Sequence, residues 1–118
     1  MEKVDLSEKL ALFDTQWDPK VVATYNGNDV MVVKVEGAFP FHKHDDTDDF
    51  FPVLEGDVTI DGEDGASVSM GPGQLCVVPK GVVHRPRAER EATVLLIEPE
   101  GEPNTGDSGR PAAAKERI

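Results

Sequence analysis

The chain has 118 residues, 38% of them hydrophobic, and a formal net charge of −11 at pH 7. This length suffices for one small domain with a single core. Because so acidic a chain repels phosphate groups, neither nucleic acid nor an anionic membrane surface is an expected partner. The single cysteine, Cys76, excludes an internal disulfide. Together with an N-terminus that lacks an apolar signal core, it leads us to expect a cytoplasmic protein.

The first segment, residues 1–19, reads as a short helical arm that packs on the main body. Asp5 is placed to cap the helix, and Glu8 stands three residues later, as in a capping box. The apolar residues at helical spacing, which share one face, are Leu6, Leu10 and Phe13.

From residue 20 to residue 99 the pattern is that of short β-strands. Runs such as "KVVATY", "VMVVKVE" and "ATVLLIE" are separated by the turn signals "NGND", "DGEDG" and "GPG". Asn26-Gly27 is a strong hairpin signal, because both residues tolerate positive φ. The pattern predicts an all-β sandwich or barrel. Residues 100–118 lose the periodicity and read as a polar C-terminal tail.

Two of the three histidines stand in the stretch "FHKHDDTDDF". If this stretch is extended, His42 and His44 point to the same side, about 6–7 Å apart along the chain. A bare His-x-His pair is more often an ordinary surface or core pair than a metal site. Two further residues strengthen the metal interpretation: Asp49, just before an apolar strand, and His84, the third histidine, just after a Pro-Lys-Gly turn.

In these residues the sequence resembles the cupin superfamily, in particular its small single-domain bacterial members. The first cupin motif is matched, with its first gap one residue short, by Gly37, His42, His44, Asp49 and Gly56. The second motif is matched in full by Gly73, Pro79, Gly81 and His84. The chain departs from the pattern at Ala88, where asparagine is usual, and at Asp49, where glutamate is usual. The resemblance covers residues 20–99.

The resemblance implies a jelly-roll barrel, also called a double-stranded β-helix, that holds one divalent transition metal: Mn, Fe, Co, Ni, Cu or Zn. The implied ligands are His42, His44 and His84, with Asp49 as the fourth. Because aspartate is one methylene shorter than glutamate, three arrangements are open. The backbone shifts inward, the carboxylate binds through a water, or three histidines hold the metal alone.

Strand alternation from Asp49 and His84 predicts the wall around this site. The expected lining residues are Phe51, Val53, Val58 and Ile60, with Phe39 or Met70. Pro86 should also face inward, whereas Arg85 and Arg87 should face away, so the pocket is not expected to favour a highly phosphorylated ligand. A small neutral or carboxylate-bearing molecule fits better. Phe50 and Leu54 should face outward, where they are candidates for the contact of a homodimer.

Three functions remain open on the sequence. The first is a metal-dependent enzyme, of dioxygenase or of isomerase/lyase type, although we expect no inward Glu, Lys or Tyr as a general base. The second is a module that binds or senses a small molecule without turnover. The third is a metal-free relic of the fold, suggested by aspartate in place of glutamate. The fold alone does not decide between them.

Overall fold

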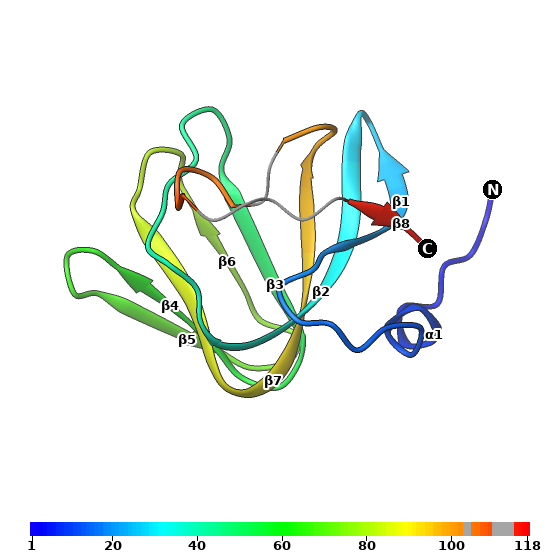
Figure 1. The fold of residues 1–118 in the computed structure, drawn as a ribbon, viewed down its shortest axis with the longest axis horizontal. Helices are drawn as coiled ribbons and strands as arrows, with labels where there is room; N and C mark the ends of the chain where they lie inside the picture. Colours follow the sequence, from blue (N-terminus) through cyan, green and yellow to red (C-terminus); the bar gives the residue numbers. More distant parts are fainter. Residues whose placement is uncertain (103–104, 110–114) are drawn as a thin grey trace.

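The computed structural model describes residues 1–102, 105–109 and 115–118. The expected all-β fold with a short N-terminal helix is confirmed (Figure 1). The elements are α1 Leu6–Leu10, β1 Lys20–Tyr25, β2 Asn28–Ala38, β3 Asp49–Glu55, β4 Val58–Gly62, β5 Ser67–Met70, β6 Leu75–Val78, β7 His84–Pro99 and β8 Glu116–Arg117. Figure 1 shows α1 at one end of the molecule and the hairpin of β4 and β5 at the other.

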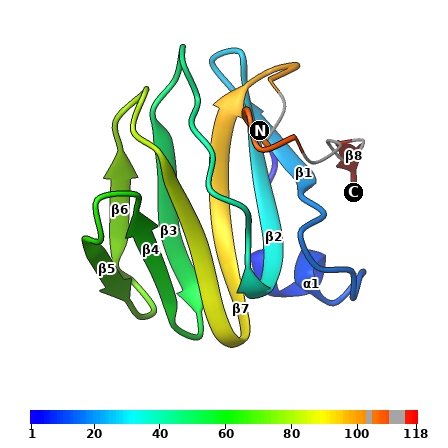
Figure 2. The ribbon, with the colours of Figure 1, turned by 60° about the vertical axis from the view of Figure 1, so that its left-hand side comes forward.

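The long strand β7 connects the parts of the barrel. The strand order is β5-β4-β7-β2-β1-β8, and β3 pairs with both β6 and β7. β7 pairs with β4 over residues 84–87, with β2 over residues 87–99 and with β3 at residues 93–94. Figure 2 shows β2 and β7 side by side along most of their length. Because β7 pairs with β4, β2 and β3 in turn, its inward side chains line several parts of the barrel wall.

The hairpin between β1 and β2 forms where the sequence predicts it. Asn26 and Gly27 have φ angles of 47° and 75°, the left-handed conformation that a two-residue turn of this kind requires. Tyr25 pairs with Asn28 on either side of the turn. The Asn28 side-chain amide donates to the Tyr25 carbonyl oxygen at 3.1 Å, which ties the turn further.

The N-terminal arm contains the predicted helix, which is only five residues long. The Glu8 amide donates to Asp5 Oδ1 at 3.2 Å, so Asp5 is the N-cap. The helix ends at Leu10, so Phe13 lies beyond it. Leu10 packs with Val22 and Val32 on the outside of the sheet, which attaches the arm to the barrel.

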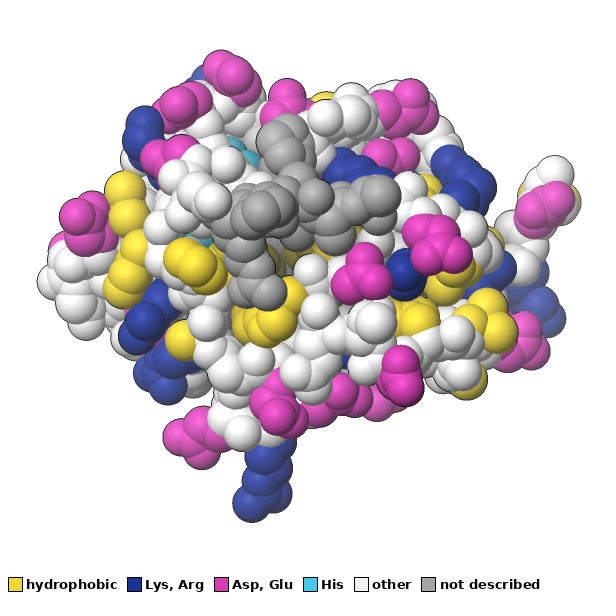
Figure 3. Space-filling model, in the orientation of Figure 1, with side chains coloured by type: hydrophobic (Ala, Val, Ile, Leu, Met, Phe, Trp, Pro, Cys, Tyr) yellow, Lys and Arg dark blue, Asp and Glu magenta, His cyan; other side chains and the backbone are white. Residues whose placement is uncertain are grey.

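The interior of the barrel is a single apolar cluster drawn from β1 to β7. Its buried members are Val21, Met31, Val33, Val35, Phe51, Val53, Val58, Ile60, Met70, Val78, Ala88, Ala92, Val94 and Leu96. In the part of the chain that the structure describes, no helix has the length and apolar character needed to cross a membrane. Acidic side chains are spread over the face in Figure 3, in keeping with the negative net charge.

The described parts of the predicted tail contact the barrel. β8 pairs in parallel with β1, and the Ile118 amide donates to the Val21 carbonyl oxygen at 3.0 Å. Lys20 Nζ lies 2.8 Å from a Glu116 carboxylate oxygen, which adds an ion pair to the same contact. The division into an arm, a barrel and a tail at residues 19 and 99 stays a prediction.

Candidate metal centre

Backbone pairing between two distant segments positions the histidines. The His42 amide donates to the His84 carbonyl oxygen at 3.0 Å, and the His84 amide donates back to the His42 carbonyl oxygen at 2.9 Å. This bridge sets the two imidazole rings side by side, with centroids 4.7 Å apart. The Gly81 amide donates to the His44 carbonyl oxygen at 2.8 Å, which fixes His44 against the turn before β7.

The structure brings the four residues predicted as metal ligands into one cluster. Asp49, the first residue of β3, places its Oδ2 atom 2.8 Å from His84 Nε2, 3.2 Å from His44 Nε2 and 4.0 Å from His42 Nε2. The four candidate ligand atoms all lie within 4.8 Å of one another. Each of the four side chains is at most 9% exposed. Aspartate therefore reaches the three imidazoles despite its short side chain.

Two backbone carbonyls orient the imidazoles. His42 Nδ1 lies 2.9 Å from the Pro40 carbonyl oxygen, and His84 Nδ1 lies 2.8 Å from the Val82 carbonyl oxygen. Because a carbonyl oxygen only accepts, each Nδ1 must carry a proton and donate it. Nε2 is then the nitrogen that faces the cluster, which is the usual way in which a metal-binding histidine is held.

His44 supplies a direct test of whether a metal fits. Its Nε2 atom is buried and makes no hydrogen bond within the described residues, because its 3.2 Å approach to Asp49 Oδ2 lacks hydrogen-bond geometry. An unsatisfied buried nitrogen is costly, and a metal ion satisfies it. Three imidazole nitrogens and one carboxylate oxygen are also the donors that divalent transition metals prefer. The residues present therefore fit such an ion.

The charges in the cluster favour a cation. Burial would raise the pKa of Asp49, but its contacts with His44 and His84 outweigh that effect and lower the pKa to about 2. Burial lowers the pKa of His42, which favours its neutral, ligating form. At neutral pH the cluster therefore presents an ionised carboxylate and at least one neutral imidazole.

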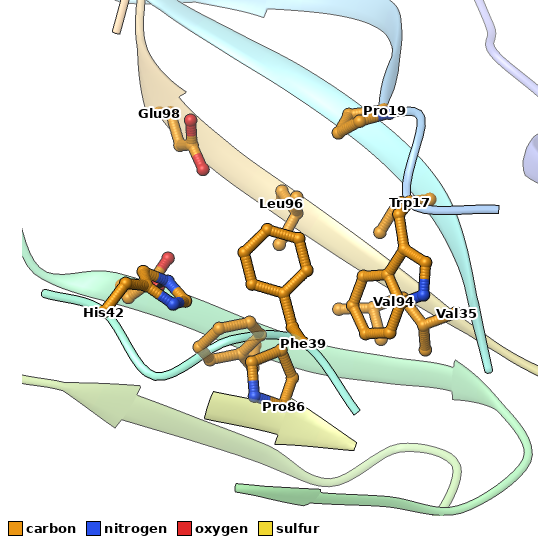
Figure 4. Close-up of a pocket in the computed structure, with 12 residues that line it drawn as sticks. Trp17, Pro19, Val35, Phe39, His42, Pro86, Val94, Leu96 and Glu98 are labelled. Atoms are coloured by element: carbon orange, nitrogen blue, oxygen red, sulfur yellow. Dashed lines mark ion pairs between the residues drawn. The ribbon is translucent and has the colours of Figure 1, made fainter. Parts of the chain in front are cut away.

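A cavity adjoins the cluster and has two chemically different ends (Figure 4). His42 and Glu98 lie at its polar end, and Trp17 and Val35 lie at the opposite, apolar end. Asp49 also lines the cavity, with its Oδ2 atom 4.0 Å from His42 Nε2. The empty space of the cavity, counted together with the open solvent at its mouth, is about 480 Å³, and the enclosed part is much smaller. The complete lining is Trp17, Pro19, Val33, Val35, Phe39, His42, Asp49, Phe51, Pro86, Val94, Leu96 and Glu98.

Only part of the predicted pocket wall lines this cavity. Phe51 and Phe39 do so. The other predicted lining residues belong to the buried apolar cluster and are not part of the cavity wall: Val53, Val58, Ile60 and Met70. Alternation along a strand tells which side chains point inward, but it does not tell how far along the barrel side chains fill the interior.

The arginines beside His84 point away from the cavity, as expected. Arg85 Nε and Arg87 Nε lie 3.1 Å and 2.8 Å from Asp61 Oδ2, whereas Pro86 between them lines the cavity. Both guanidinium groups are thus engaged by a carboxylate outside the cavity. Neither is available to bind a phosphate inside it.

Glu98 is the residue that sequence reasoning missed, and it corrects the expectation that no inward glutamate lies near the site. It is the last inward residue of β7, it is 6% exposed, and it lines the cavity. Burial and the charge of Asp49 raise the pKa of its carboxyl group to about 7, against the opposing effect of Lys115. The alternation of Val94, Leu96 and Glu98 was a signal that could have found it.

A segment of the C-terminal region forms another wall of the centre. The Lys43 amide donates to Asp107 Oδ1 at 2.6 Å, and the Asp107 amide donates to the Lys43 carbonyl oxygen at 3.2 Å. Gly106, at φ +53°, lies so close that an added Cβ would meet the Lys43 carbonyl oxygen at 2.5 Å and the His42 and His44 rings at 3.1 and 3.2 Å. Only glycine permits this approach.

The comparisons with known proteins agree with this geometry. The chain is 31% identical over 77 residues to the uncharacterized protein YdbB of Bacillus subtilis (strain 168), covering 65% of this chain and 68% of YdbB. It is 39% identical to a cupin-2 domain containing protein from Shewanella frigidimarina NCIMB 400, whose crystal structure matches with a TM-score of 0.80 over 82% of this chain and 94% of the other.

A more distant similarity joins the chain to an enzyme of the same fold. The hydroquinone 1,2-dioxygenase PnpCD, solved in complex with Cd²⁺ and 4-hydroxybenzonitrile, is 20% identical, with a TM-score of 0.67 over 92% of this chain and 74% of that one. At this identity the similarity concerns the fold alone. The family model of the cupin domain matches residues 29–98, more than half of the sequence. The chain therefore belongs to the cupin family.

Proposed function

We propose that this protein is a metal-dependent enzyme that acts on a small, largely apolar molecule. One divalent transition metal (Mn, Fe, Co, Ni, Cu or Zn) would be held by His42, His44, His84 and Asp49. The observation that carries the proposal is the convergence of these four ligand atoms within 4.8 Å at the polar end of an otherwise apolar cavity. When bound, such a metal supplies Lewis-acid activation or, if it is redox-active, a site for O₂.

The residues of the chain prepare the site for these tasks. The carbonyl oxygens of Pro40 and Val82 keep His42 and His84 in the tautomer that ligates through Nε2. The Asp49 carboxylate supplies a negative charge. The apolar wall excludes water, which strengthens every electrostatic interaction inside the cavity.

The lining of the cavity supports a restricted class of substrate. Trp17 and Phe39, whose ring centroids are 5.1 Å apart, offer aromatic contacts to a small hydrocarbon body. Arg85 and Arg87 pair with Asp61 outside the cavity, which argues against a phosphorylated substrate. That the related fold of PnpCD accommodates Cd²⁺ together with 4-hydroxybenzonitrile is compatible with a small molecule beside a metal.

A binding module without turnover has less support than the sequence suggested, because that interpretation relied on the lack of an acid or base in the pocket. Glu98 supplies such a group. The test is to load the untagged protein with Fe²⁺, Mn²⁺ or Zn²⁺ and to incubate it with a panel of small hydroxylated and apolar compounds, with and without O₂. Mass spectrometry then identifies products.

The expected result is a product that requires the metal and is absent with His44→Ala. Dependence on O₂ would identify a dioxygenase, and turnover without O₂ an isomerase or lyase. If compounds bind to the metal-loaded protein and none of them is converted, the enzymatic function is refuted in favour of a binding module.

We also propose that the protein forms a homodimer through the outer face of β3 and β6. Phe50 pairs with Val77 and Pro52 pairs with Leu75, so their side chains form one strip, in which Leu75 is 57% and Val77 49% exposed. Leu54, expected in this contact, instead packs against the cluster around α1. Sedimentation of the wild type and Val77→Lys tests the dimer: a monomeric wild type would refute it. Location in the cytoplasm stays a prediction.

A further inference from the structure

We propose that Glu98 is the proton acceptor of this centre, and that the substrate carries an ionisable hydroxyl group of phenol or enol type. This inference rests on the proposed function. It assigns a role to a buried carboxylate that lies in the same cavity as His42 and Asp49 but is not one of the candidate metal ligands.

The position of Glu98 supports this role. Figure 4 shows its side chain at the same end of the cavity as His42, opposite Trp17 and Val35. Its Oε2 atom is buried and makes no hydrogen bond within the described residues. The Lys115 ammonium forms an ion pair with this oxygen at 3.5 Å but no hydrogen bond, so a ligand that brings an O–H group to it gains one.

The charges around Glu98 leave it able to take up a proton. Asp49 of β3 lines the same cavity, and its charge raises the pKa of Glu98, whereas the charge of His44 lowers it. Lys115 Nζ lies 3.5 Å from Glu98 Oε2 and 3.7 Å from Asp29 Oδ2, so two carboxylates share one ammonium group. Burial and the charge of Asp49 raise the pKa of Glu98 to about 7, a suitable range for a general base. A divalent cation nearby would favour the ionised form.

The two ends of the cavity define the substrate. A hydrocarbon body, preferably planar, packs against Trp17 and Phe39, and its hydroxyl group reaches the end formed by His42, Asp49 and Glu98. In the proton transfer the substrate O–H bond breaks, its electron pair stays on the substrate oxygen, and the proton bonds to Glu98 Oε2. The step requires no oxidant or reductant.

A purely structural role for Glu98 would be to anchor the C-terminal region through Lys115. Two variants separate the roles. Glu98→Gln removes both the proton acceptor and the charge that anchors Lys115. Lys115→Met removes the anchor together with the positive charge beside Glu98, and it leaves the Glu98 carboxylate in the cavity.

The experiment uses the full chain loaded with Zn²⁺, which is redox-inert and colourless, and 4-nitrophenol as the probe, at a pH below the pKa of the free probe. Absorbance reports the ionised probe, and calorimetry in two buffers reports the protons released on binding. We expect the wild type and Lys115→Met to bind the probe in its yellow, ionised form without releasing a proton to the buffer. With Glu98→Gln the probe should bind uncoloured or with affinity reduced roughly tenfold or more.

Three results would overturn the inference. In the first, Glu98→Gln ionises and binds the probe as the wild type does. In the second, Lys115→Met loses the absorbance of the ionised probe to the same extent as Glu98→Gln. In the third, the zinc-loaded wild type fails to ionise the probe. Zinc content is measured on every sample. A wild type without zinc would refute the proposed function itself, which distinguishes the two failures.

Discussion

Replacing Glu98 with glutamine should change how the stability of the metal-free protein depends on pH. Burial raises the pKa of Glu98 from 4.5 to about 7. Because the folded-state pKa lies above the unfolded one, the stability that this group contributes is fully present below the unfolded pKa. It is lost as the pH rises through the folded pKa. The difference between the two pKa values corresponds to about 3 kcal/mol.

The assay is urea unfolding in the presence of a chelator from about pH 5 to about pH 8. Between these limits the wild type should lose about 2–3 kcal/mol of stability relative to Glu98→Gln, because the amide does not ionise. Glu100→Gln, the same substitution at an exposed position close to the end of the same strand, should retain the wild-type pH dependence. Parallel curves for the wild type and Glu98→Gln would refute the burial argument.

Three further predictions concern the centre and its surroundings. Asp49→Asn should weaken the affinity for a divalent metal at least about tenfold, measured by competition with a chelating dye; Asp49→Glu should bring no gain, since the carboxylate already reaches the imidazoles, and a clear gain would contradict that geometry. In urea unfolding, Gly106→Ala should cost about 1–3 kcal/mol more than Gly109→Ala, because only its Cβ would meet neighbouring atoms; equal losses would mean that the segment does not pack on the histidines. The pKa of Asp61, measured by NMR, should be about 2 because Arg87 bonds to it, and an unchanged value in Arg87→Gln would contradict this assignment.

Local chemistry made much of the fold predictable. Asn26-Gly27 adopts the positive φ angles that such a turn requires whatever surrounds it, and Asp5 caps the first helix through a contact three residues away. The cluster of His42, Asp49 and His84 could be expected because the spacing of two motifs resembles that of a known family. The structure adds how they meet: through the backbone bridge between His42 and His84.

The features that the sequence did not reveal depend on contacts over long separations. Lys115 meets Glu98 and Asp29 only because the chain returns to β1 through the two-residue strand β8, which is too short to show a periodic pattern. The need for glycine at position 106 arises from its close approach to the rings of His42 and His44. Glu98 lies near the opposite end of β7 from His84, so its place in the cavity follows only from the folded course of that strand.

The measurement that tests the central claim most directly is the metal content per chain of untagged protein, purified without a chelator, by elemental analysis alongside His44→Ala. The account predicts close to one divalent metal per wild-type chain, and its loss from the variant while the circular dichroism spectrum stays unchanged. Iron would favour O₂-dependent chemistry, and zinc, manganese or nickel would favour Lewis-acid chemistry. A wild type that holds no metal even after reconstitution, or a variant that holds as much as the wild type, would contradict the account.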